Sequence, residues 1–526
     1  MKNRTLLIRS ILLSIPVILF IAHHFFFHDK GLIPTGFALD DNPVYMANAR
    51  QYLDASHFSF FYSNPFDAAT GSPSIYLQPH NFVFAFFMKL GFEPGFIFSF
   101  FGLLFTVLSV FIGLKIIQQV YPQLQHRSTI QLLFTWGGGL TAITGLLVAM
   151  FFYKQIPPSL DSIFIGDPGN GWWGLNYGRT LFIPLEAYYH FLFLLAALFI
   201  LQEKWKAALA VAFFISLTHP FTGIEFLLIA GGWCLSEKLL WKNRNIPWYF
   251  VAGILLITAL TAWYYLFYLT SFKEHEVLHR QFSVGWTYSL YVIIPAYILV
   301  LLLSVIQYFQ SGSVKKLFAR SPQRLFFAWG VIAFLLSKHE WFIKPMQPIH
   351  FTRGYTWMGL FLFAIPVLVW ILNKLKQLKY STLALALFLL VFLSDNLLWT
   401  TNLLRKKEKN EWIGHLRPDT KRTLNWLARN TDNKDLVFSN EYLINYYSNV
   451  YGSSYSWHSH VYNTPGYEER RAQADSFIAT GTTLKEWEGR RKIIVMRKDG
   501  AGYTTIYAPF KLKPVYENQA YIIFIP

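Results

Sequence analysis

The sequence predicts a polytopic α-helical membrane protein with a small α/β domain at its C-terminal end. Of the 526 residues, 54% are hydrophobic and 19% aromatic, but only 14% are charged. Ordinary soluble domains carry about 25% charged residues, so a soluble class is excluded. Many apolar runs also approach the ~20 residues that cross a bilayer as a helix. After residue 404 these runs stop and charged residues become frequent, which predicts a separate domain there.

The apolar runs predict about eleven membrane crossings. They cover residues 11–28, 81–118, 129–153, 180–202, 207–218, 222–236, 247–270, 286–309, 324–337, 355–372 and 380–400. Two of them are short and meet at Thr218-His219-Pro220-Phe221. Because proline cannot continue a helix, we expect a break there, which forms either two short spans or a re-entrant pair. The first run follows a basic start and lacks a cleavage site of small residues, so we expect an uncleaved first span.

The Lys and Arg residues predict the orientation of these spans. The formal net charge is +17, but the basic residues are spread among alternate short loops. A nucleic-acid partner requires a clustered basic face and is therefore not expected. The positive-inside rule places the basic loops in the cytoplasm. The other connections then lie outside, as do all residues after about 405; these outer loops are 29–80, 154–179, 271–285 and 338–354.

We expect residues 1–404 to form the transmembrane domain and residues 405–526 an extracytoplasmic α/β domain. Strand-like segments alternate there with helical ones, which is typical of such a domain. The expected strands are 436–439, 492–497, 503–507 and 520–525, and the expected helices are 419–429 and 467–479. The single cysteine, Cys234, excludes an intramolecular disulfide.

Two adjacent carboxylates, Asp40 and Asp41, follow the first apolar run and precede a predicted helix. Pro43 fits the first turn of that helix, where its missing N–H costs nothing. One Asp at this place can serve as an N-terminal cap. Two in a row exceed what capping needs, and carboxylates near lipid are costly unless they are solvated, paired or used. The pair is therefore a predicted functional site.

The string Asp41-Asn42-Pro43-Val44-Tyr45, with Pro79-His80-Asn81 opening the next membrane segment, resembles the first outer loop of the GT-C superfamily. These are integral-membrane glycosyltransferases that use polyprenyl-phosphate-linked sugars. The bacterial mannosyltransferases and aminoarabinose transferases are the most similar members. The segments 187–223 and 460–470 are similar to the middle spans and to the outer domain of such proteins.

This resemblance implies an inverting sugar transfer at the outer face of the membrane, with the leading Asp as the base. That position is Asp41. Asn42 replaces the usual second acidic residue, and Asp40 either supplies the missing carboxylate or is itself the base. The partners are then a polyprenyl-phosphate-sugar donor and a glycan, lipid or protein acceptor. The localisation implied is a bacterial inner membrane with an extracytoplasmic active side.

A departing lipid phosphate needs cationic groups, and Arg matches phosphate with paired donors. Arg353 is the first choice because it precedes a span on the outer side and has aromatic neighbours. The other expected phosphate-binding residues lie in the same or other outer loops: His350, Arg280, His279, Arg179 and Lys344. The alternative for each is an interfacial residue or a loop ion pair.

Aromatic and histidine side chains on the outer side are expected to contact the substrates, because aromatic faces pack against sugar C–H groups. These residues are Tyr45, His80, Trp172, Trp173, His219, His458 and His460. For the tryptophans an aromatic belt at the lipid interface is an equal alternative. The paired His275 and His279 have metal-ligand spacing, but a polar helix explains them better.

We expect no metal site and no cofactor, since donors with one phosphate need no metal in the similar families. Two alternatives remain open. One is an oligosaccharyltransferase with a lipid-diphosphate donor and a divalent ion bridging Asp40 or Asp41 with Asp161 or Asp167. The other is a transporter or flippase, since such proteins also place few charges among many helices.

Overall fold

The structure is a computed structural model that describes residues 3–55, 59–69, 71–167, 171–282, 285–499 and 513–526. The chain divides into two compact units. The first, here called the helical unit, consists of Met1–Phe20, Phe101–Trp263 and Ser283–Lys406. The second, the mixed unit, consists of Ile21–Phe100, Tyr264–Phe282 and Lys407–Pro526. Two of the five divisions fall inside helices, at 20/21 in α2 and at 100/101 in α5.

The first predicted segments form α1 (Asn3–Leu13), α2 (Ile15–Phe26), α5 (Pro94–Val120), α6 (Arg127–Trp136) and α7 (Thr141–Phe151). After the short α8 (Leu160–Ile163) and α9 (Tyr177–Thr180) come α10 (Pro184–Leu201), α11 (Trp205–Thr218), α12 (Pro220–Leu239) and α13 (Trp248–Trp263). The last ones are α15 (Leu290–Ser311), α16 (Val314–Leu317), α17 (Ser321–Ser337), α18 (Tyr355–Lys376) and α19 (Ser381–Arg405). As predicted, the chain breaks at His219, between α11 and α12.

The polytopic helical class is confirmed, and the protein is a multi-pass membrane protein. Among the described residues, six helices are long and apolar enough to cross a membrane, or up to eight if each bent pair, α1 with α2 and α6 with α7, counts as one span. The sequence predicted about eleven. Predicted run 81–118 is not one span, because Leu90–Glu93 separate α4 (Pro79–Lys89) from α5. Predicted segments 207–218, 222–236 and 324–337 form α11, α12 and α17, which fall outside this set.

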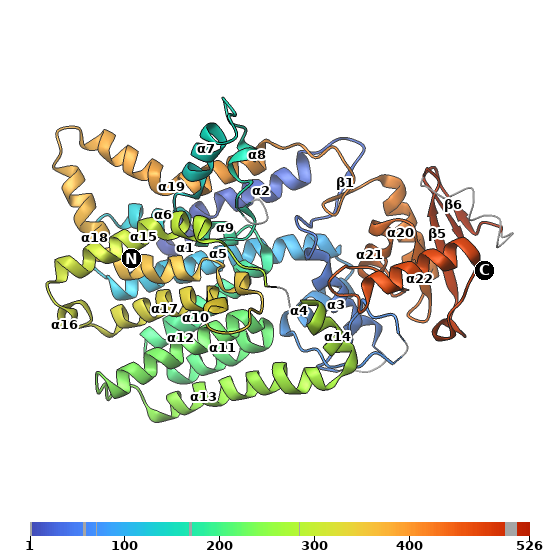
Figure 1. Ribbon diagram of the computed structural model, residues 1–526, viewed down its shortest axis with the longest axis horizontal. Coiled ribbons are helices and arrows are strands. Elements are labelled where there is room, and N and C mark those ends of the chain that lie inside the picture. Colours follow the sequence, from blue (N-terminus) through green and yellow to red (C-terminus); the bar gives the residue numbers. More distant parts are fainter. Residues whose placement is uncertain (1–2, 56–58, 70, 168–170, 283–284, 500–512) are drawn as a thin grey trace. The chain divides into compact units, whose positions relative to one another are not determined.

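Within the helical unit, α10, α11, α12, α17 and α18 pack in succession (Figure 1). Aromatic rings fill the space between these helices: Phe193 of α10 packs on Trp329 of α17, with ring centroids 4.7 Å apart. The side chains of Trp329 and Trp357 are fully buried. Such aromatic contacts each contribute about 0.5–1.5 kcal/mol beyond the burial of their area.

The mixed unit contains a five-stranded sheet in the order β4-β3-β5-β7-β6. The strands are β3 (Leu436–Ser439), β4 (Tyr455–Ser456), β5 (Lys492–Arg497), β6 (Tyr516–Glu517) and β7 (Tyr521–Phe524). β3 is parallel to β4 and β5, whereas β7 is antiparallel to β5 and β6. The predicted strands 436–439, 492–497 and 520–525 are confirmed; predicted strand 503–507 lies outside the described residues.

Helices cover both faces of this sheet. Successive strand residues point to opposite faces. Leu436 and Phe438 pack with Phe477 of α22 (Tyr467–Thr480) in one apolar core. On the other face, the Tyr521 hydroxyl lies 3.2 Å from Thr420 Oγ1 of α20 (Pro418–Asn430). These two helices match predicted helices 467–479 and 419–429; α21 (Tyr442–Tyr451) and the short η6 (Lys485–Trp487) were not predicted.

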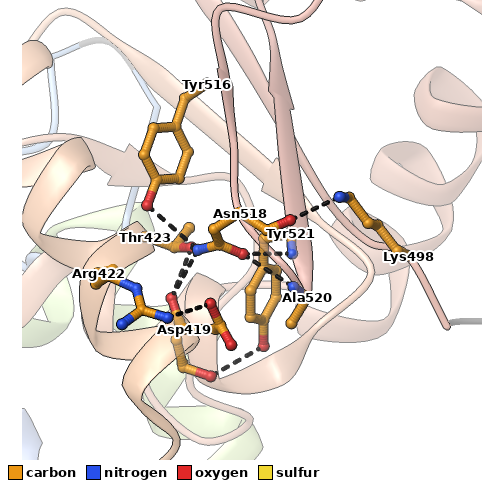
Figure 2. A network of polar contacts seen from close by, with 9 residues as sticks. Asp419, Arg422, Thr423, Lys498, Tyr516, Asn518, Ala520 and Tyr521 are labelled. Atoms are coloured by element: carbon orange, nitrogen blue, oxygen red, sulfur yellow. Dashed lines mark hydrogen bonds and ion pairs between the residues drawn. The ribbon is translucent and has the colours of Figure 1, made fainter.

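Asn518 joins the turn before β7 to α20 (Figure 2). Its carboxamide oxygen accepts from the backbone N–H groups of Ala520 and Tyr521, at 3.0 and 2.8 Å. Its amide nitrogen donates to Thr423 Oγ1 at 3.0 Å and to the Asp419 carbonyl at 3.1 Å. One polar side chain therefore holds the edge hairpin on the helix that covers it.

The mixed unit also includes parts of the chain far from its C-terminal end. Its β1 (Ile33–Pro34) pairs antiparallel with β2 (His415–Leu416). It further contains α3 (Asn42–Asp54), α4, η2 (Tyr264–Tyr268), η3 (Leu269–Ser271) and α14 (Lys273–Phe282). The first predicted outer loop and the C-terminal residues thus belong to one compact unit.

A buried carboxylate fixes a chain reversal in the helical unit. Asp395 of α19 accepts from Ala142 N and Thr141 Oγ1, both at 2.7 Å, and from Gly139 N at 3.0 Å. Its side chain therefore caps the start of α7, because the first N–H groups of a helix have no partner within the helix. The sequence offered no partner for this intramembrane carboxylate; the fold supplies three.

We expect Asp395→Ala to lower the unfolding free energy by about 2–4 kcal/mol, because three donors would be left buried without their acceptor. Thermal unfolding in lipid nanodiscs measures the loss. The control is Ser394→Ala, whose hydroxyl donates to the Val391 carbonyl within the same helix. Equal thermal midpoints for the two variants would contradict the capping role.

Candidate active site

The segment that carries the two carboxylates is held by backbone pairing with the C-terminal residues of the mixed unit. Ile33 pairs with Leu416, and Thr35 N donates to the Gly414 carbonyl at 2.9 Å. The chain then turns at Gly36, which has φ of +84°. A Cβ on Gly36 would lie 2.3 Å from the Gly95 carbonyl oxygen, so only glycine fits this close approach.

Asn42, not Asp41, organises the turn before α3. Its side-chain oxygen accepts from the backbone N–H groups of Leu39 and Ala38, at 3.0 and 3.2 Å. Asp41 occupies the N-cap position, yet its side chain makes no capping hydrogen bond. The capping alternative therefore does not account for Asp41, whose side chain is 71% exposed.

Asp40, Asp41, Tyr442, Tyr446 and His460 form what we call the acidic cluster. Tyr446 of α21 donates to the Asp40 carbonyl at 2.5 Å, and the Tyr442 hydroxyl lies 3.3 Å from both Asp40 carboxylate oxygens. Burial raises the pKa of the Asp40 carboxyl, against the opposing effects of His460 and the Tyr442 hydrogen bond. Burial and the neighbouring Asp40 also raise the pKa of Tyr442, so its hydroxyl remains a donor.

His460 lies beside Asp41. Its Nε2 is 3.1 Å from Asp41 Oδ1 and 3.9 Å from Asp40 Oδ2. The imidazole side chain is fully buried, whereas 42% of the Asp40 and 71% of the Asp41 side chain are exposed. The two carboxylates therefore differ: Asp40 is mostly engaged by tyrosines, and Asp41 projects toward solvent beside a buried histidine.

In the helical unit, Arg353 is the centre of a second group of residues, which we call the cationic cluster. Its guanidinium pairs with Glu186 of α10 and contacts His350 Nδ1. Arg353 lies on the turn between η5 (Pro348–Phe351) and α18, where Gly354 adopts φ of +76°. The guanidinium carbon is 5.5 Å from the centre of the Trp173 ring, a cation–π contact.

Aromatic rings surround His350 in this cluster. Trp173 packs edge-on against it with centroids 5.0 Å apart, and Phe221 stacks on it at 4.4 Å. His219 lies 6.5 Å from His350, ring centre to ring centre, and stacks on Tyr189 at 4.4 Å. His219 Nδ1 also accepts from Thr222 N, which caps α12. Predicted residues Arg353, His350, Trp173 and His219 are thus brought together.

The other predicted phosphate-binding residues are Arg179 and Lys344 in the helical unit and Arg280 and His279 in the mixed unit. Arg179 is buried and forms a 2.5 Å ion pair with buried Asp167, which fits the structural alternative. Arg280 pairs with Glu276 on the surface of α14, with 77% of its side chain exposed. His279 belongs to the same helix, in the mixed unit, and Lys344 is exposed after the short helix η4 (His339–Trp341).

Several predicted substrate-binding residues are packed against other side chains. Trp172 makes edge contacts with Phe20 and Trp399. Buried His80 lies between Tyr45 and Phe84, and Tyr45 also stacks on Phe98. His458 is buried behind Asn445, and burial lowers its pKa to about 4. These contacts give His80, Trp172 and His458 packing roles.

Among the described residues, no three His, Cys, Asp or Glu side chains are grouped so that they hold a metal ion. Asp161 forms ion pairs with Arg405 and Lys406, and Asp167 pairs with Arg179. His275 Nδ1 forms a hydrogen bond with the Tyr76 hydroxyl, and burial lowers the pKa of His275 to about 4.

The sequence alone did not identify Tyr442, Tyr446 or Glu186 as members of these clusters. The first two lie on one face of α21, four residues apart, which is the spacing of neighbours on a helix surface. The tyrosine-rich amphipathic segment 442–451 could therefore have indicated a helix with hydroxyl groups on one face. The sequence contains no comparable signal for the pairing of Glu186 with Arg353, because 167 positions of chain (353 − 186) separate them and only tertiary packing joins them.

The raised pKa of Asp40 predicts a pH-dependent stability. The folded protein holds this proton more tightly than the unfolded chain, so the ionisation of Asp40 costs stability as pH rises above the ordinary Asp range. We expect Asp40→Asn to raise the thermal midpoint relative to wild type at pH 7 and to change it little at about pH 4. Asp41→Asn, on the more exposed neighbour, is the control. A gain for Asp40→Asn that is equal at both pH values would contradict the explanation.

No protein-family model and no curated protein matches the chain. Over nearly its full length, the chain is structurally similar to solved GT-C glycosyltransferases. ArnT from Cupriavidus metallidurans bound to undecaprenyl phosphate has 12% identity and a TM-score of 0.48, covering 97% of this chain and 96% of ArnT. The mycobacterial arabinofuranosyltransferase AftD has 13% identity and a TM-score of 0.48, covering 100% of this chain and 40% of AftD. The Archaeoglobus fulgidus oligosaccharyltransferase in complex with Zn and sulfate has 11% identity and a TM-score of 0.44, covering 96% of this chain and 69% of that enzyme. At TM-scores below 0.5 these likenesses carry no conclusion about activity.

Proposed function

We propose that this membrane protein is an inverting glycosyltransferase that transfers a sugar from a polyprenyl-phosphate-linked donor to an acceptor hydroxyl or amine. Asp41 is the general base, and Arg353 with His350 binds the donor phosphate. The proposal places the reaction at the outer face of a bacterial inner membrane, with residues 405–526 on the same side. It requires no metal ion and no cofactor.

The observation that carries this proposal is the exposure of the Asp41 carboxylate and its contact with a buried histidine. Its carboxylate stands at the start of α3, makes no capping hydrogen bond and is 71% exposed. It also has a buried histidine 3.1 Å away. Such a carboxylate has a buried hydrogen-bonding partner, is exposed to solvent and does not cap its own helix. These properties suit proton abstraction from an incoming substrate.

The reaction gives each residue a defined task. As the acceptor oxygen or nitrogen attacks the anomeric carbon, its proton passes to Asp41. The new bond forms on the face opposite the phosphate, and the bond from the anomeric carbon to the phosphate oxygen breaks. The lipid phosphate leaves with the electron pair of that bond. Cationic donors stabilise the charge that develops on it.

Arg353 suits the phosphate because a guanidinium offers paired donors to phosphate oxygens. In the structure, Glu186 holds this guanidinium in place and Trp173 lies against it. Because the Arg353 guanidinium can only donate, His350 Nδ1 accepts from it, and the ring keeps its N–H on Nε2 as a second donor. The cationic cluster thus holds a buried guanidinium, paired with Glu186, among aromatic rings, a setting suited to a phosphate carried by an apolar lipid.

One observation favours a second function. Glu225 of α12 is fully buried, and neither of its carboxylate oxygens has a hydrogen-bond partner among the described residues. Ionisable residues inside membrane helices often mark ion or substrate pathways. A transporter in which Glu225 carries a proton or binds a solute would show uptake into proteoliposomes that Glu225→Gln abolishes, with no sugar transfer.

The first test compares wild type with Asp41→Asn in lipid nanodiscs, using a panel of radiolabelled polyprenyl-phosphate sugars. We expect wild type to release or transfer sugar from one donor, and Asp41→Asn to be slower by roughly 10²–10⁴-fold while the donor still binds. Asp40→Asn is the matched control and is expected to keep most of the activity.

Full activity of Asp41→Asn would remove Asp41 as the base. If Asp41→Asn keeps full activity and Asp40→Asn loses its activity, Asp40 is the general base. Repeating the assay with a chelator tests the alternative with a lipid-diphosphate donor: activity that survives supports metal independence, and activity that disappears supports the bridged-ion mechanism.

The second test separates phosphate binding by Arg353 from its part in the ion pair. Either single variant, Arg353→Gln or Glu186→Gln, leaves a buried charge without its partner and is expected to lose about 3–5 kcal/mol of stability. The double variant Glu186→Gln/Arg353→Gln should recover most of that stability and still bind donor at least about tenfold more weakly, because the phosphate loses charge-assisted donors. Unchanged donor affinity in the stable double variant would reduce Arg353 to a structural role.

A further inference from the structure

His460 has a fixed hydrogen-bonding pattern on both ring nitrogens. On one side, the backbone N–H of Tyr462 points at His460 Nδ1 at 3.3 Å. The Asn463 side-chain nitrogen lies 2.8 Å from the same atom. On the other side, Nε2 faces Asp41 Oδ1 at 3.1 Å.

These partners determine the tautomer of His460. A backbone N–H can only donate, so Nδ1 must present its lone pair to Tyr462. The ring proton is then on Nε2, where an ionised carboxylate accepts it. A proton on Nδ1 would face the Tyr462 N–H. The ring is therefore an acceptor toward its own turn and a donor toward Asp41.

The ring is also immobilised by its surroundings. Its side chain has no exposed surface. The rings of Tyr446 and Phe66 pack against it, with centroids 5.2 and 5.9 Å away. The turn that carries it is held through Asn463, whose carbonyl accepts from Asn64 Nδ2 at 2.8 Å. A donor fixed in this way imposes its geometry on an exposed carboxylate.

We propose that His460 is a positioning residue for the base: its Nε2–H holds Asp41 Oδ1, and thereby orients the carboxylate and stabilises its ionised form. This inference rests on the function proposed above. It assigns His460, which the sequence placed among substrate contacts, to the carboxylate itself. It also makes the C-terminal domain part of the catalytic apparatus.

The proton balance keeps His460 out of the transfer step. The acceptor proton moves to Asp41 as the new glycosidic bond forms and the bond to phosphate breaks. His460 already carries a proton on Nε2, and its Nδ1 is occupied by the Tyr462 N–H, so the ring takes up no further proton. Asp41, with 71% of its side chain exposed, returns the acquired proton to solvent.

Three substitutions separate the donor from the rest of the ring. In His460→Gln, the amide nitrogen reaches the place of Nε2 and can still donate to Asp41. In His460→Asn, the shorter amide reaches the place of Nδ1, keeps the acceptor toward Tyr462 and loses the donor. His460→Leu loses both. The control is His458→Asn, since His458 is buried nearby but contacts Asn445.

We expect His460→Gln to stay within about threefold of wild type, whereas His460→Asn and His460→Leu lower kcat by about 10–100-fold with KM nearly unchanged. The acidic limb of the pH–rate profile should move to higher pH in the last two variants, because an ionised carboxylate that loses a donor is protonated more easily. His458→Asn should leave the pH–rate profile unmoved. A purely structural role would not move the limb.

The outcomes distinguish this inference from the proposed function. If Asp41→Asn is inactive but His460→Asn and His460→Leu match wild type in rate and pH profile, the inference is wrong and the function stands. If Asp41→Asn is fully active, Asp41 is not the base, and the proposed function is contradicted before the role of His460 is tested. Should His460→Leu not fold, His460→Asn against His460→Gln decides: equal activity in the two overturns the positioning role. The double variant Asp41→Asn/His460→Asn should be no slower than Asp41→Asn alone, and an additional loss would show that His460 acts independently.

Discussion

The position of Asp41 depends on the backbone pairing between residues 33–35 and 413–416. This short ladder, with the Thr35 hydrogen bonds to Ile413 and Gly414, ties the segment before α3 to the residues that precede the five-stranded sheet of the mixed unit. Tyr442, Tyr446 and His460 can then reach Asp40 and Asp41. Without the ladder, ordering the exposed acidic segment would cost roughly 1–2 kcal/mol of conformational entropy for each residue.

One rule describes several buried charges in the helical unit: each is held by an opposite charge or by several donors. Glu225, whose carboxylate oxygens have no hydrogen-bond partner among the described residues, is an exception. Arg179 is paired with Asp167, Arg353 with Glu186, and Asp395 accepts three hydrogen bonds at the start of α7. Isolated charges in a low-dielectric interior would cost several kcal/mol each. Arg179 and Arg353 are both buried and paired, so pairing alone does not choose between them as phosphate ligands. Arg353 remains the proposed one because it lies on a turn among aromatic rings and contacts His350.

Much of the fold was readable from the sequence, and the errors have identifiable causes. Strands 436–439 and 492–497 were predicted because short β-branched and apolar segments between polar turns have few other solutions. Hydropathy measures apolar length but not where a helix breaks. The run 81–118 thus hides the turn between α4 and α5. Helix α21 was missed because its tyrosines and asparagines have weak helix preference, and packing on β3 overrides it.

The sequence by itself determined the class of the molecule, the order of its helices and the α/β character of its C-terminal residues, and it predicted a site at Asp40 and Asp41. These follow from composition, periodicity and the cost of charge near lipid, which are local properties. Only the tertiary structure decided which carboxylate is engaged by tyrosines and which faces solvent, and that His460 lies beside Asp41 across 419 positions of chain. Hydrogen-bond partners distant in the chain are set by packing, and no spacing rule along a single sequence encodes them.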